Sequence, residues 1–216
     1  MPSLHGFNTF GELILNSIVV KRLIIILLIV TVSFPLLSQD KKDEAQVIPE
    51  MKPALVIIDI QNKFLPYMSS EQDKALEMIN WAIFVAREYK IPVIRVYHTD
   101  PNWGPKPGTE EFEFPESIKI NEDDPKVIKN YGDGFKNTDL EKILTEKGIN
   151  TLFLCGLSAT GCVLATYHGA KNLEYDVFML QDAIISSDQQ LTKAVEKICE
   201  SVSLDTFNFM MKYLKR

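Results

Sequence analysis

Three side chains with reactive groups follow apolar runs of the chain: the carboxylate of Asp59, the amine of Lys129 and the thiol of Cys162. A thiol attacks a carbonyl only as the thiolate, and a nearby ammonium and a helix N-terminus both lower the pKa of a thiol. A carboxylate within reach can take the thiol proton and later return it to a leaving amine. Backbone amides in the turn before Cys162 could hold the negative oxygen formed on attack. These residue types therefore indicate hydrolysis through a covalent intermediate.

Each of the three residues also has an ordinary structural interpretation. Asp59 could cap a helix or anchor a loop, and Lys129 could be a solvated lysine. Cys162 could be a small buried hydrophobe, which is the commonest fate of a cysteine. The catalytic interpretation is favoured only when the three are taken together.

The segments around them alternate short β-branched runs with helical patterns. Residues 54–60 are almost wholly apolar, which is typical of a central strand covered on both faces. Ser70 and Asp73 match a capping box ahead of a helix that runs to Tyr89. The same kind of pattern predicts further strands at 91–97, 126–129, 151–155, 176–180 and near 202, and further helices at 138–147, 161–172, 189–200 and the C-terminus.

This alternation builds parallel sheets, because each right-handed crossover needs a helix to return the chain. We therefore predict a three-layer α/β/α fold of the Rossmann-like class, with a central, mainly parallel sheet of about six strands. Ligands of such sheets bind outside the carboxyl ends of the strands, which is where Asp59, Lys129 and Cys162 fall. A long polar loop, residues 99–124, is too long to be a mere connector and is expected to influence specificity.

Composition narrows the possible functions. The chain has 216 residues, of which 46% are hydrophobic, enough for one full core but not for two. A net charge of -6 makes a nucleic-acid partner unexpected, because such surfaces need clustered Lys and Arg. Three Cys, without a CxxC pair, and the histidines His5, His98 and His168 are too few for a disulfide framework or a structural zinc site.

The first residues resemble a secretory signal. Lys21 and Arg22 precede an apolar stretch at 23–34, and the small residue Ser38 follows before a polar run. We predict a signal peptide over 1–38, a linker over 39–52, and a hydrolase domain over 53–216 that is periplasmic or secreted. The alternative is an uncleaved N-terminal anchor, which would be the only contact with a membrane.

Four motifs resemble those of the isochorismatase-like cysteine hydrolases, a superfamily that includes nicotinamidases, amidohydrolases of N-carbamoylsarcosine and ureidoacrylate, biuret hydrolases and isochorismatases. The resemblance covers about residues 53–205. The matching positions are Asp59, Gln61 and Phe64 in the first motif, Lys129, Phe135, Thr138 and Leu140 in the second, Gly156, Cys162, Val163 and Thr166 in the third, and Gln181, Asp182 and Ala183 in the fourth.

The resemblance implies a role for each site residue. Asp59 would be the general base and then the acid, Lys129 the cation that stabilises the thiolate, and Cys162 the nucleophile that forms an acyl intermediate. A cis peptide between Leu157 and Ser158 would aim the Ser158 amide, alongside that of Cys162, at the oxyanion. Members of the superfamily commonly associate, so a homo-oligomer is expected.

The substrate pocket is expected to be lined by aromatic residues, with one polar neighbour from the first motif. The predicted substrate-binding residues are Gln61, Phe64, Trp103 and Phe135. The acidic pairs Glu110/Glu111 and Asp123/Asp124 of the long loop are interpreted as solvated charges.

Departures from the family pattern narrow the subclass. The nicotinamidase metal site uses an Asp and two His after the second strand, but this region has Asp100 and no histidine beyond His98. Neither a metal nor another cofactor is expected, and nicotinamide is disfavoured. Isochorismatases that cleave a vinyl ether lack the thiol that this chain has at Cys162. His168 is interpreted as a packing or interface residue.

The resulting hypothesis is a cysteine hydrolase that cleaves a C–N bond in a small amide, carbamoyl or ureido compound. Three alternatives remain open at this point. The chain could be an isochorismatase-type enzyme, a binding protein that kept the fold and lost catalysis, or a thiol redox protein using Cys155 and Cys162.

Overall fold

The computed structural model describes residues 49–214, and the described residues from Glu50 onward form one compact unit. The predicted signal peptide and most of the predicted linker lie outside the described residues. Among the residues that are described, no helix has both the length and the hydrophobicity needed to cross a membrane.

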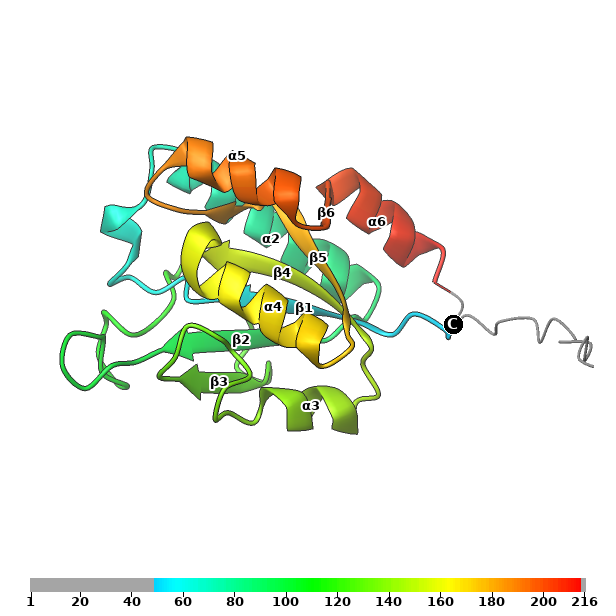
Figure 1. The fold of residues 1–216 in the computed structure, drawn as a ribbon, viewed down its shortest axis with the longest axis horizontal. Helices are drawn as coiled ribbons and strands as arrows, with labels where there is room; N and C mark the ends of the chain where they lie inside the picture. Colours follow the sequence, from blue (N-terminus) through cyan, green and yellow to red (C-terminus); the bar gives the residue numbers. More distant parts are fainter. Residues whose placement is uncertain (1–48, 215–216) are drawn as a thin grey trace, which may run out of the picture. The chain divides into compact units, whose positions relative to one another are not determined.

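The centre of the unit is a six-stranded sheet in which every pair of neighbouring strands is parallel. Its order is β3-β2-β1-β4-β5-β6 (Figure 1). The strands are β1 (Pro53–Ile58), β2 (Val93–His98), β3 (Lys126–Lys129), β4 (Thr151–Leu157), β5 (Asp176–Ile185) and β6 (Ser201–Val202). The prediction of about six mainly parallel strands is confirmed.

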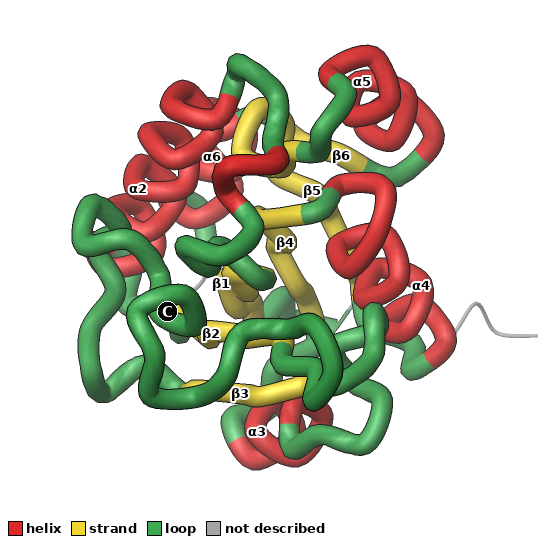
Figure 2. Tube along the Cα trace, turned by 90° about the vertical axis from the view of Figure 1, so that its left-hand side faces the viewer, coloured by secondary structure: helices red, strands yellow, loops and turns green. Residues whose placement is uncertain are grey.

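Helices cover both faces of the sheet (Figure 2). One face carries α2 (Gln72–Glu88) and α6 (Leu204–Lys212), and the other carries α3 (Leu140–Glu146), α4 (Leu164–Asn172) and α5 (Gln189–Ile198). Side chains of β1 alternate between the two cores: Leu55 and Ile57 pack toward α2, whereas Val56 and Ile58 pack toward α3 and α4. The three-layer α/β/α architecture is therefore confirmed.

Several element boundaries differ from the expected ones. Helix α2 begins after Glu71, whose side chain makes no capping hydrogen bond, so the capping box predicted from Ser70 is wrong. Strand β5 continues to Ile185, beyond the predicted end, through Asp182, which has a left-handed backbone with φ of 61°. The predicted helix over 161–172 divides into a π-helical turn, η3 (Ala159–Val163), and α4.

The long loop between β2 and β3 is held against the sheet by aromatic stacking. Tyr97 stacks on Phe112 and Phe114, with ring centroids 5.1 and 4.1 Å apart. All three side chains are buried. The middle of the loop therefore packs as part of the core.

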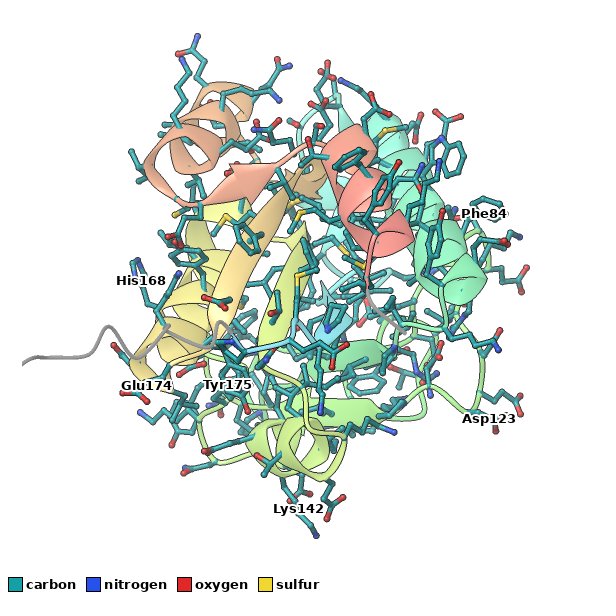
Figure 3. The ribbon with its side chains drawn as sticks, turned by 90° about the vertical axis from the view of Figure 1, so that its right-hand side faces the viewer. Phe84, Asp123, Lys142, His168, Glu174 and Tyr175 are labelled. Carbon is teal, nitrogen blue, oxygen red and sulfur yellow. The ribbon has the colours of Figure 1, made fainter. Side chains whose placement is uncertain are left out.

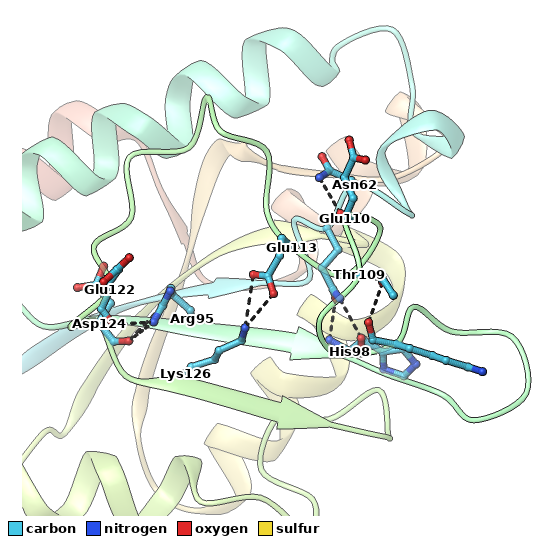
Figure 4. A network of polar contacts seen from close by, with 11 residues as sticks. Asn62, Arg95, His98, Thr109, Glu110, Glu113, Glu122, Asp124 and Lys126 are labelled. Carbon is cyan, nitrogen blue, oxygen red and sulfur yellow. Dashed lines mark hydrogen bonds and ion pairs between the residues drawn. The ribbon is translucent and has the colours of Figure 1, made fainter.

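Polar contacts fasten the same loop at several further points (Figure 4). Lys126 Nζ lies 3.3 Å from Glu113 Oε1, and Asn62 donates to the backbone carbonyl of Glu110. Asp124 is buried, accepts a hydrogen bond from Arg87, and its carbonyl accepts from Arg95. The interpretation of Asp124 as a solvated charge is therefore wrong, because its carboxylate is buried and Arg87 of α2 compensates that charge.

Candidate active site

The carboxyl ends of the strands bring the three reactive residues together. The strand order reverses direction between β1 and β4, and a crevice opens where neighbouring strands of a parallel sheet lead away in opposite directions. Asp59 follows β1, Cys162 lies in η3 after β4, and Lys129 ends β3. Figure 2 shows this edge of the sheet with the loops gathered around it.

A buried ion pair forms the base of the site. Lys129 Nζ lies 2.6 Å from Asp59 Oδ2, and both side chains are at most 2% exposed. The same ammonium donates to the carbonyl of Tyr131 at 3.2 Å and lies 3.4 Å from His98 Nδ1. Because these groups take up all three ammonium protons, the Lys129 side chain has a fixed position. Lys129 is therefore not the solvated lysine of the alternative interpretation.

The close approach of β1 and β4 places the segment that carries Cys162 beside Asp59. Gly156 of β4 has φ of 118°, and a Cβ atom there would lie 2.1 Å from the carbonyl oxygen of Ile58. Only glycine combines this backbone conformation with such an approach. One residue further along, the peptide bond between Leu157 and Ser158 is cis, as the family resemblance implies.

The thiol of Cys162 lies close to the carboxylate of Asp59. Sγ of Cys162, a carboxylate oxygen of Asp59 and a ring nitrogen of His98 all lie within 4.8 Å of one another. Asp59 Oδ1 is buried and accepts no hydrogen bond from the described residues. This oxygen is therefore available to accept the thiol proton.

The environment of the site raises the pKa of both the Cys162 thiol and the Asp59 carboxyl. Burial, followed by the Asp59 carboxylate, raises the pKa of the Cys162 thiol to about 12, and Lys129 offsets only part of this effect. Lys129 lowers the thiol pKa as expected, but burial and the Asp59 carboxylate outweigh it, so the net shift of the pKa is upward. Burial also raises the pKa of Asp59, although the charge of Lys129 acts in the opposite direction. The raised pKa makes the Asp59 carboxylate a stronger base. The resting site holds a thiol beside a base.

Asp59, His98 and Cys162 also form a set of oxygen, nitrogen and sulfur atoms whose spacing could hold a metal ion. The Lys129 ammonium already lies against two of these three side chains. Its positive charge would repel a divalent cation at this position. The residues present therefore fit an internal ammonium better than a bound metal.

A cavity of about 590 Å³ opens in front of Cys162. Of the predicted site residues, Asp59, Phe64, Trp103, Ser158 and Cys162 line it. Phe64 and Trp103 are in edge contact, with ring centroids 6.3 Å apart. Most of the remaining wall is apolar, from Tyr67, Met68 and Leu157.

Two predicted substrate-binding residues lie elsewhere. Gln61 is fully buried, donates to the carbonyl of His98 at 2.9 Å and accepts from its amide at 2.8 Å. Phe135 stacks on Tyr175 with a centroid separation of 5.8 Å and packs against the core under α3 and α4. Neither residue lines the cavity in the described structure, so the substrate contacts expected of them are corrected to structural ones.

His98 is a site residue that the sequence did not identify. It is 7% exposed, lines the cavity and lies beside both Phe64 and Trp103. Burial and the charge of Lys129 lower the pKa of His98, so its ring is neutral at neutral pH. The one available signal was its place at the end of a strand, the same signal that identified Lys129.

Two other residues lie away from the site. His168 is exposed on α4, where its ring meets Tyr167 edge-on, and Figure 3 shows it on the outer surface. Cys155 is fully buried and packs on the α2 side of the sheet, whereas Cys162 packs on the α4 side. The redox pairing of Cys155 with Cys162 is therefore wrong, because the sheet separates them.

Comparisons with known proteins agree with this architecture. The YddQ protein of Bacillus subtilis, an uncharacterized isochorismatase family protein, is 31% identical over 147 residues, covering 65% of this chain and 82% of its own. The structure of an isochorismatase-like hydrolase from Alkaliphilus metalliredigens superimposes with a TM-score of 0.70 at 22% identity, covering 74% of this chain and 91% of its own.

A third protein carries a more specific name. The N-carbamoylsarcosine amidase of Thermoplasma acidophilum is 27% identical, with a TM-score of 0.64, over 72% of this chain and 98% of its own. The family model for the isochorismatase domain matches residues 53–200, which include the three reactive side chains and the cavity. The chain therefore belongs to the isochorismatase family of hydrolases.

Proposed function

We propose that the protein is a cysteine hydrolase that cleaves a C–N bond in a small amide, carbamoyl or ureido compound. The observation that carries the proposal is the convergence of three separate segments: Asp59 and Cys162 line one cavity, and the buried Lys129 pairs with Asp59 behind it. A protonated thiol beside a buried base of raised pKa suits proton transfer during attack.

The reaction would proceed in two halves. Cys162 Sγ bonds to the carbonyl carbon as its proton passes to Asp59 Oδ1, and the amides of Ser158 and Cys162 hold the oxyanion. The C–N bond then breaks as Asp59 returns the proton to the leaving nitrogen, which leaves a thioester. Water attacks the thioester and gives a proton to Asp59, which passes it to the departing sulfur and restores the thiol. Lys129 balances the charge of Asp59 throughout.

Two observations favour C–N hydrolysis over the cleavage of a vinyl ether. Ether cleavage needs no sulfur nucleophile, yet the sulfur of Cys162 lies at the cavity within reach of a base. The likeness to the N-carbamoylsarcosine amidase extends over nearly all of that protein. The proposal therefore takes the reaction type, but not the substrate, from this relative.

A screen of small amides, carbamates and ureas for ammonia or amine release tests the proposal. We expect turnover by the wild-type protein and its loss in Cys162→Ala. Cys199→Ala is the matched control, because Cys199 is also partly exposed but lies outside the cavity lining. Turnover that survives in Cys162→Ala would refute the mechanism, and a wild-type protein without turnover would favour the binding-protein alternative.

A further inference from the structure

The backbone around His98 is held more firmly than the end of a strand requires. Both ends of the buried Gln61 amide bond to it, one to the carbonyl and one to the amide of His98. On the other side, His98 pairs in parallel register with Lys129 of β3. The imidazole is therefore presented to the cavity from a fixed backbone position.

The contact with Lys129 favours one tautomer of the His98 ring. An ammonium has only donors, so His98 Nδ1, 3.4 Å from Lys129 Nζ, is the acceptor of this contact. A neutral imidazole that accepts at Nδ1 carries its hydrogen on Nε2. The ring therefore offers one N–H group, directed away from the ion pair.

This Nε2–H group has no partner among the described residues, although it is buried. A buried donor without an acceptor is costly, and native structures rarely leave one without a reason. The rings of Phe64 and Trp103 flank His98, and Trp103 is 64% exposed. All three side chains line the cavity, so the His98 ring forms part of its wall.

We propose that His98 Nε2–H donates a hydrogen bond to an acceptor atom of the substrate close to the scissile carbonyl. The inference rests on the proposed function, because it places the substrate carbonyl at Cys162. It makes His98 a substrate-binding residue, whereas Gln61 acts only through the position of His98.

The rest of the cavity indicates the kind of substrate. The walls from Phe64, Tyr67, Met68, Trp103 and Leu157 are apolar or aromatic. The cation at the cavity edge, Lys63, is already paired with Glu111 at 3.0 Å, and Lys129 is paired with Asp59. An uncharged, planar amide or urea with one acceptor atom beyond its carboxamide fits this surface better than a carboxylate-bearing compound.

Two amide substitutions separate the functions of the two ring nitrogens. His98→Asn keeps a polar group near Nδ1, beside Lys129, and removes the donor at Nε2. His98→Gln carries its amide nitrogen near the place of Nε2 and removes the Nδ1 acceptor. Thermal unfolding checks that each variant folds, and ¹⁵N spectra of the wild-type imidazoles, assigned by comparison with His98→Asn, report whether Nε2 is protonated.

Matched ligands isolate the proposed hydrogen bond. Benzamide and phenylurea are compared with their pyridyl counterparts, in which a ring nitrogen replaces one C–H group at each position in turn. We expect at least one pyridyl compound other than nicotinamide, the 3-pyridyl amide that the missing metal ligands disfavour, to exceed its carbon analogue about ten-fold in kcat/KM, mainly through KM. That preference should disappear in His98→Asn and persist at least partly in His98→Gln.

Calorimetric binding of the same compounds to Cys162→Ala makes the test independent of turnover. If the Cys162→Ala variant binds a pyridyl compound more tightly than its carbon analogue, and this preference depends on His98, the inference is supported. That result would hold even if hydrolysis did not need Cys162. If neither turnover nor binding shows a pyridyl preference, or if His98→Asn retains it, the inference is overturned. Hydrolysis that requires Cys162 would still leave the proposed function in place.

Discussion

Two clusters of carboxylates and lysines lie on the same sheet, and only one of them has the properties of a reactive site. The first is the ion pair of Asp59 with Lys129, and the second joins Asp182 to Lys74, Lys193 and Glu196. Both aspartates belong to motifs that resemble the family's, and both have left-handed backbones, with φ of 53° and 61°. Neither sequence motif nor backbone conformation distinguishes them.

Burial and pairing do distinguish the two clusters. The Asp59 side chain is 2% exposed, and one of its oxygens has no hydrogen-bond partner within residues 49–214. The Asp182 side chain is 38% exposed, and its Oδ1 lies 2.7 Å from Lys193 and 3.3 Å from Lys74. Burial raises the pKa of Asp59, whereas the hydrogen bond from Lys193, with help from Lys74, lowers the pKa of Asp182.

The cavities beside the two aspartates also differ in size. The space beside Asp182 is about 20 Å³, against about 590 Å³ in front of Cys162. The smaller volume is about that of one water molecule. Asp59 has a raised pKa and lies beside a cavity with room for a ligand, so it can take a proton from a reactant. The ion pairs of the Asp182 cluster instead connect α2, β5 and α5.

Removing the charge of each aspartate in turn should separate the two clusters most clearly. Asp59→Asn should lower kcat about 10³-fold, because the thiol loses its base. Asp182→Asn, the matched control, should leave kcat within about three-fold, which ammonia release measures. Similar losses in both variants would show that the location of the carboxylate does not determine its role.

The alkylation rate of Cys162 should show a smaller effect of the Asp59 charge. Its rate in the wild-type protein should rise with pH without a plateau up to pH 9, because burial and Asp59 raise the thiol pKa to about 12. Asp59→Asn should accelerate alkylation several-fold at pH 8, since the repelling carboxylate is gone while Lys129 remains. Iodoacetamide labelling with peptide mapping distinguishes Cys162 from Cys199. A slower rate in Asp59→Asn would contradict the assigned cause of the raised pKa.

Acid unfolding gives the smallest expected effect. Because the folded-state pKa of Asp182 is lowered, its carboxylate stabilises the fold above the unfolded pKa of about 3.9. That contribution is lost as pH falls through the lower folded pKa. Asp182→Asn should therefore lower Tm by at most about 3 °C at pH 7, with a difference that vanishes near pH 2. A difference that grew toward low pH would contradict the direction of the shift.

Most of the fold could be predicted because its signals are local. Apolar runs such as residues 54–60 reveal buried strands, and their alternation with helical patterns leads to the parallel sheet of the structure. The predictions that were wrong concern features that depend on contacts between distant segments of the chain. Strand β5 continues through Asp182 because β4 pairs with it past an irregularity between Leu154 and Gly156.

The candidate site was predictable only in part. Asp59, Lys129 and Cys162 stand out because reactive residue types at strand ends can meet in a parallel sheet. His98 ends a strand in the same way, but nothing local distinguishes it from a packing residue. Gln61 and Phe135 matched family motifs, yet the structure uses one to hold the backbone of His98 and the other in the core.

By itself, the sequence determined the strands and helices, the sheet edge to which the reactive residues belong and the family motifs, because hydrophobic periodicity and residue type act over a few neighbouring positions. The tertiary structure alone decided the direction of the pKa shift at Cys162, the placement of His98 at the cavity and the contrast between Asp59 and Asp182. Those properties depend on how deeply a group is buried and on charges contributed by remote segments, and both are consequences of distances in space.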